Sequence, residues 1–108
     1  MQDILERIDR IKFAESLRAQ NQTMDLSQEA QLVFDAILYD LLIIGEAAKL
    51  LSPSMKGRNP LVPWGLITGM RDILAHEYFR VDIEIIRSTI DKPLENLQLA
   101  CRNELDLR

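Results

Sequence analysis

An arginine and the only histidine of the chain lie five residues apart, as Arg71 and His76. A guanidinium stays charged and offers forked hydrogen-bond donors to phosphate oxygens, so it can stabilise charge that grows on phosphorus. An imidazole titrates near neutrality, so it can take a proton from a hydroxyl or return one to a leaving group. The pair therefore suits metal-free cleavage of a phosphodiester. RNA is the substrate that this chemistry favours, because its own 2′-hydroxyl can act as the nucleophile.

The segment that carries this pair has the apolar spacing of a helix. On a helix from Trp64 to Glu77, five apolar residues fall on one face at about 100° per residue, namely Leu66, Ile67, Met70, Ile73 and Leu74. Arg71 and His76 flank this face, about 140° apart around the axis. The arc between them forms a shallow polar strip of Thr68, Asp72 and Ala75. A simpler interpretation stays open, in which the arginine belongs to a solvated face and the histidine is a cation near the C-terminal dipole.

A longer pattern adds weight to the chemical interpretation. The string from Pro60 to Asp82, with Ile44-Gly45-Glu46-Ala47-Ala48 upstream, closely resembles the HepT-like toxins of the HEPN superfamily. Those proteins carry R-x4-H-x-Y at the end of their third helix, matched here by Arg71, His76 and Tyr78. The resemblance covers nearly the whole chain. Asp72 departs from it, because many members have asparagine there, and it adds a negative charge beside the proposed phosphate site.

The resemblance implies a fold and an activity. The fold would be all-α, an antiparallel up-and-down bundle of four to five helices that forms a homodimer, with the two motifs facing each other across a cleft. The activity would be that of a toxin in a type VII-like toxin–antitoxin system, a metal-independent endoribonuclease without a cofactor. Arg71 would contact the phosphate and His76 would handle the proton. An MntA-like minimal nucleotidyltransferase antitoxin would neutralise the toxin by adenylylating Tyr78, because added phosphate and bulk there would occlude the anion site.

A second function uses the same residues. In this alternative the chain is a non-catalytic helical dimer that binds and regulates a nucleotidyltransferase, with Arg71 and Tyr78 serving nucleotide contact or modification. The net charge of −4 slightly favours it, because a general RNA binder is expected to carry a basic patch. If RNA is the substrate, binding depends on both copies of Arg71, joined by Arg80 and Arg87, in one cleft.

Composition predicts a single domain over residues 1–108. Hydrophobic residues at 47% and charged residues at 28% are ordinary globular values. A lone cysteine, Cys101, excludes an internal disulfide, is expected to be a small apolar core residue, and fits a reducing cytoplasm. One histidine and one cysteine argue against a zinc or iron site. The acidic N-terminus and the short apolar runs predict neither a secretion signal nor a membrane span.

Periodicity divides the chain into helical segments. We expect helices from Asp3 to Ala19 and from about Leu26 to Leu51, a surface loop over Pro53 to Pro63, and a last helical segment from Val81 to Leu107. Pro93 must kink or break that last segment. The second helix is apolar on more than one side and therefore needs more than one packing partner. A second copy of the chain is the simplest supplier.

Two further features concern the surroundings of the site. Glu46, and with it Asp72, is assigned a supporting role: Glu46 is either a boundary carboxylate bonded locally or a group that orients Arg71 or His76, in cis or across the dimer. Gly65 and Gly69 cost about 1 kcal/mol each within a helix. Gly65 and Gly69 lie on one face of the helix with His76, and the missing side chains allow another backbone to approach. We therefore predict that this face packs near a neighbouring helix or the dimer twofold, with a tight contact inside the chain as the alternative.

Overall fold

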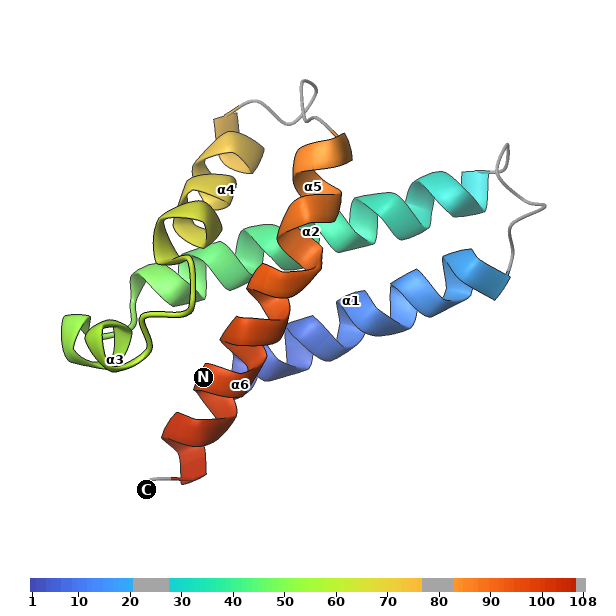
Figure 1. Ribbon diagram of the computed structural model, residues 1–108. Helices are drawn as coiled ribbons and strands as arrows, with labels where there is room; N and C mark the ends of the chain where they lie inside the picture. The colour runs from blue at the N-terminus through green and yellow to red at the C-terminus, as the bar shows by residue number, and fades with distance from the viewer. Residues whose placement is uncertain (21–27, 77–82, 107–108) are drawn as a thin grey trace.

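The computed structural model describes residues 1–20, 28–76 and 83–106. In these ranges the chain forms six helices and no strand (Figure 1): α1 (Gln2–Gln20), α2 (Gln28–Lys49), α3 (Pro53–Arg58), α4 (Trp64–His76), α5 (Ile83–Ile90) and α6 (Lys92–Asp106). The all-α class predicted from the sequence is confirmed. The helices outnumber the four to five expected, because the segment after α2 contains a helix of its own and the last segment is divided in two.

The first two helices form an antiparallel hairpin (Figure 1). Each presents an apolar stripe at helical spacing to the other, and the fully buried side chains of this contact include Ile4, Ile8 and Ile11 of α1 and Ile37 and Ile44 of α2. Burying an isoleucine side chain contributes about 1.5–3 kcal/mol. This contact is the centre of the core: α4 packs against α2, and α6 packs against α1.

A buried carboxylate ties α1 to α2. Asp40, which is only 2% exposed, accepts hydrogen bonds from Arg7 Nη1 at 2.9 Å and Arg10 Nε at 3.3 Å. The Arg7 guanidinium also lies over the Tyr39 ring, 5.5 Å from its centroid. An ionised carboxylate is costly to bury unless it is paired, and the two arginines of α1 supply that pairing.

The second packing partner of α2 is α4 of the same chain. This contact accounts for part of the broad apolar surface of α2, and a second copy of the chain as a further partner stays a prediction. The face of α4 is also narrower than predicted: Ile67, Met70 and Leu74 are buried, whereas Leu66 is 40% exposed and Ile73 is 37% exposed. Because α2 is the main neighbour of α4, only one side of its apolar face is covered.

The predicted surface loop over Pro53 to Pro63 is wrong in its first half, which forms α3. Ser52 is the N-cap, and its hydroxyl oxygen accepts a hydrogen bond from the Met55 backbone N–H at 3.1 Å. Pro53 follows in the first turn, where a missing N–H costs no helical hydrogen bond. Serine and proline favour helix starts as well as turns, and burial of Met55 decides the outcome in favour of the helix.

The last segment behaves as its proline predicts. Ile90 ends α5, Lys92 begins α6, and Pro93 occupies the first turn of α6, where proline is tolerated. On α6, Cys101 is fully buried, and burial raises the pKa of its thiol to about 11. The structural role predicted for this cysteine is therefore confirmed. None of the helices in the described ranges combines the length and apolar content needed to cross a membrane.

Candidate functional site

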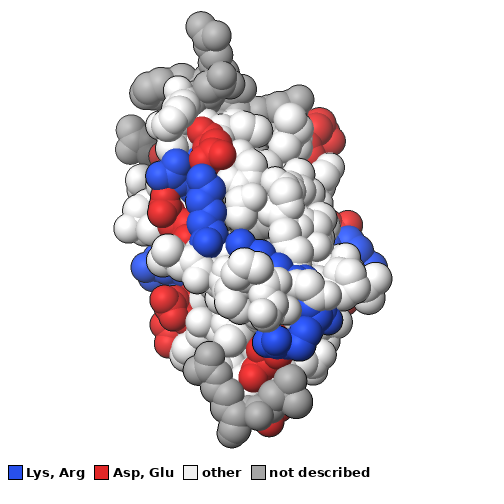
Figure 2. Space-filling model, turned by 90° about the vertical axis from the view of Figure 1, so that its left-hand side faces the viewer, with Lys and Arg blue, Asp and Glu red and all other residues white. Residues whose placement is uncertain are grey.

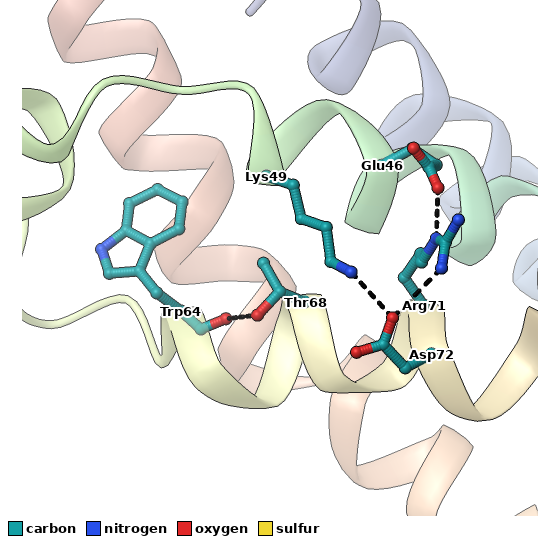
Figure 3. A network of polar contacts seen from close by, with 6 residues as sticks. All are labelled: Glu46, Lys49, Trp64, Thr68, Arg71 and Asp72. Carbon is teal, nitrogen blue, oxygen red and sulfur yellow. Dashed lines mark hydrogen bonds and ion pairs between the residues drawn. The ribbon is translucent and has the colours of Figure 1, made fainter.

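Both predicted catalytic residues lie on α4. His76 is the last residue of the helix and its side chain is exposed, whereas the Arg71 side chain is 28% exposed beside α2. Five residues correspond to about 7.5 Å along a helix axis. The polar groups around the arginine come from α2 and α4 and form one network (Figure 3).

A glycine on α2 allows the arginine to lie close to that helix. A Cβ atom added at Gly45 would be 2.4 Å from Arg71 Cβ, 3.1 Å from the Ile67 carbonyl oxygen and 3.3 Å from Arg71 Cα. Only a residue without a side chain fits at this distance, because real carbon–carbon contacts are about 3.5–4.0 Å. The close helix approach that glycines predict is therefore made at Gly45.

The other two glycines of interest behave differently. Among the described residues, a Cβ added at Gly65 or Gly69 would meet nothing within 4 Å. The alternative of a tight contact inside the chain is therefore wrong for both residues. Their packing at a dimer twofold stays a prediction.

Carboxylates on both sides hold the Arg71 guanidinium. Its Nε donates a hydrogen bond to Glu46 Oε1, and its Nη1 donates to Asp72 Oδ1 at 3.2 Å (Figure 3). The pKa of Arg71 is raised above its ordinary value, first by the hydrogen bond with Glu46 and then by that with Asp72. Of the possibilities predicted for Glu46, the structure contains the contact with Arg71 within one chain. Its catalytic value stays a prediction.

A lysine that the sequence did not single out completes the network. Lys49 Nζ donates to Asp72 Oδ1 at 2.7 Å, so one carboxylate oxygen accepts from both Lys49 and Arg71 (Figure 3). These contacts, that of Lys49 first, lower the pKa of Asp72 below its ordinary value. Lys49 lies one turn beyond Gly45 on α2, so a helix that touches the glycine also passes the lysine. This spacing was the signal available in the sequence.

The polar strip expected between the arginine and the histidine is present in part. Asp72 and Ala75 are exposed beside His76, but the Thr68 hydroxyl donates to the Trp64 carbonyl oxygen at 2.9 Å and is satisfied by its own helix. Tyr78, the predicted adenylylation site, lies outside the described residues.

The described surface carries both signs of charge. Figure 2 shows lysine and arginine side chains in small groups beside aspartate and glutamate, with a broad uncharged area between them. Two hollows lie away from the site: one of about 510 Å³ between α1 and α2, and one of about 460 Å³ between α1 and the α5–α6 segment. Among the described residues, no group of three or more His, Cys, Asp and Glu side chains could hold a metal ion.

Comparison with known proteins yields one family. The family model described as Ribonuclease HepT-like matches residues 1–103. A putative RNase of Caldanaerobacter subterraneus is 46% identical over 63 residues, which are 58% of this chain and 56% of that protein. A probable ribonuclease HepT of Thermococcus cleftensis is 36% identical over 63 residues, 58% of this chain and 57% of that protein. A putative RNase of Methanocaldococcus jannaschii is 33% identical over 95 residues, 87% and 74% of the two chains.

The chain spans somewhat over half the length of the first two of these relatives. No solved structure gives a significant match.

Proposed function

The chain belongs to the HepT-like ribonuclease family, and from that premise we propose that it is a metal-independent endoribonuclease that uses Arg71 and His76. Arg71 contacts the scissile phosphate and stabilises the charge that develops on it. His76 takes the proton from the 2′-hydroxyl or returns one to the leaving oxygen. One observation carries the proposal. In the described structure, an arginine oriented by two carboxylates and an exposed histidine occupy the last turns of the same helix.

The active form is a homodimer that pairs the two copies of α4. Leu66 and Ile73 are apolar residues seven positions apart and partly exposed, and Gly65 and Gly69 leave open space beside them. A second α4 covering this surface would bury the two apolar side chains and approach closely along the glycines. His76 ends the same helix, so dimerisation brings both histidines and both arginines towards one cleft.

The biological role is that of a cytoplasmic toxin with an MntA-like nucleotidyltransferase as its antitoxin. The family membership supports this role, and Tyr78 is two residues after His76 in the sequence. An adenylyl group on the Tyr78 hydroxyl adds a phosphodiester charge that can pair with Arg71 and exclude the RNA phosphate. Coexpression with such an antitoxin, followed by intact-mass measurement of the wild type and Tyr78→Phe, tests this role. An adenylyl mass on Tyr78→Phe contradicts the assignment.

The catalytic assignment is tested by RNA cleavage in the presence of EDTA. His76→Ala is expected to lower the rate by about 10²–10⁴-fold, the usual contribution of general acid–base catalysis. Because His76 is exposed, the variant should keep its helical circular dichroism and its stability to within about 0.5 kcal/mol. Arg71→Ala is expected to lose cleavage too, whereas Arg102→Ala, on the exposed side of α6, serves as the matched control. Cleavage that survives in His76→Ala, or that requires Mg²⁺, refutes the mechanism.

The alternative function is a non-catalytic dimer that binds and regulates a nucleotidyltransferase. Two observations favour it over RNA cleavage: the Arg71 guanidinium is already paired with carboxylates, and the charges in Figure 2 are of mixed sign. A wild-type chain that binds the nucleotidyltransferase and ATP but cleaves no RNA would decide for this alternative.

A further inference from the structure

A single oxygen atom in the network lies between two cations. Asp72 Oδ1 is 2.7 Å from Lys49 Nζ and 3.2 Å from Arg71 Nη1. Phosphate oxygens bind protein cations at similar distances, because lysine and arginine donate charge-assisted hydrogen bonds to phosphates as they do to carboxylates. The Asp72 carboxylate therefore occupies a position that a phosphate oxygen could take.

We propose that Lys49 and Arg71 together bind one RNA phosphate, and that Asp72 is an internal competitor which the phosphate displaces. The inference rests on the proposed ribonuclease function and extends it by a second phosphate-binding residue, contributed by α2. In the free protein, one carboxylate oxygen of Asp72 accepts hydrogen bonds from both Lys49 and Arg71. When RNA binds, the carboxylate moves into solvent and the phosphate takes over its two donors.

The exposure of the three side chains permits this exchange. Lys49 is 39% exposed and Asp72 is 55% exposed, so the carboxylate can leave the pair and be hydrated without a buried charge being left behind. Arg71 is more enclosed, at 28%, and retains its bond to Glu46 on the opposite side. The guanidinium thus stays oriented while one of its donors changes partner.

If Lys49 had only a structural role, its ion pair with Asp72 would add little to the stability of the fold. Ion pairs between exposed side chains contribute little to stability. Lys49 is also in the last turn of α2, where a cation interacts favourably with the helix dipole. Both effects would be independent of RNA, and this separates them from the proposal in a binding experiment.

The test measures binding without cleavage. A fluorescently labelled oligouridylate with 2′-O-methyl groups presents phosphates but has no nucleophilic hydroxyl, and its anisotropy reports the dissociation constant over a range of salt concentrations. Lys49→Gln, Asp72→Asn and the double variant are compared with the wild type. Lys92→Gln and Glu95→Gln are matched controls. Lys92 Nζ and Glu95 Oε2 form an exposed ion pair at 3.7 Å on α6, and the two substitutions change the net charge in the same way as Lys49→Gln and Asp72→Asn.

We expect Lys49→Gln to weaken binding about three- to tenfold and Asp72→Asn to strengthen it, each by more than its control. The slope of log K against log salt should fall by about 0.7 in Lys49→Gln, as for one lost contact to single-stranded nucleic acid. The decisive comparison is Lys49→Gln in the Asp72→Asn background. In that background, the loss of RNA affinity caused by Lys49→Gln should persist or grow, because no carboxylate competes with the phosphate for the lysine.

Three results would overturn the inference. Lys49→Gln could have no effect once Asp72 is replaced, both variants could match their controls, or the wild type could fail to bind the probe at low salt. Cleavage of unmodified RNA is measured in parallel. If that cleavage still depends on His76, the ribonuclease proposal stands while the role of Lys49 falls. If the wild type cleaves nothing, the ribonuclease proposal itself is wrong.

Discussion

Replacing Gly45 with alanine places a methyl group where α2 and α4 are in closest contact. The added Cβ would be 2.4 Å from Arg71 Cβ and 3.1 Å from the Ile67 carbonyl oxygen. Both are atoms at or next to the backbone of α4, so no side-chain rotation can relieve the clash. The helices must separate by about 1 Å to restore an ordinary contact distance.

The energetic cost has two opposing parts. Overpacking of this kind costs about 1–3 kcal/mol. Alanine in place of glycine within a helix returns about 1 kcal/mol, so the net loss of unfolding free energy is about 0–2 kcal/mol. The effect on activity should be larger than the effect on stability, because a shift of about 1 Å in a catalytic group can cost about 10²-fold in rate.

Urea denaturation and the RNA cleavage rate, measured on the same preparations, check this prediction. Gly69→Ala is the matched control for the stability measurement, because Gly69 is also inside a helix, has no positive φ, and has open space at its Cβ. Under conditions where the protomer is monomeric, this control should gain about 1 kcal/mol in stability. A Gly45→Ala protein that gains the same stability and cleaves RNA at the wild-type rate would refute the close approach of α2 to Arg71.

Three other predictions follow from burial and exposure. Ile73→Glu should abolish the dimer in sedimentation experiments while changing protomer stability by no more than about 0.5 kcal/mol, because the side chain is partly exposed; an intact dimer would exclude this face. Cys101, whose pKa is raised to about 11 by burial, should resist thiol reagents at neutral pH in the native state and react in denaturant. Equal reaction rates in the two states would contradict its burial. Asp40→Ala should cost about 1–3 kcal/mol in thermal unfolding, since Arg7 and Arg10 lose their buried partner; a loss no larger than that of an exposed ion pair would show that Asp40 does not tie α1 to α2.

The sequence determined the features that depend on local spacing. The stripe of isoleucines predicted α1, and Pro93 predicted the break between α5 and α6, because helical periodicity and the missing proline N–H act within a few residues. Arg71 and His76 could be proposed as a pair for the same reason, since a helix sets the relation of residues five positions apart. Helix α3 was missed because Ser52 and Pro53 favour a turn as well as a helix start.

Tertiary structure decided which residues from different helices meet. The sequence does not state that α4 lies against α2, and the close approach falls at Gly45 and not at Gly65 or Gly69. That packing brings Glu46 to one side of Arg71 and brings Lys49 to Asp72. These contacts join positions more than twenty residues apart in the chain, and they exist only because the helices have to bury their apolar faces together.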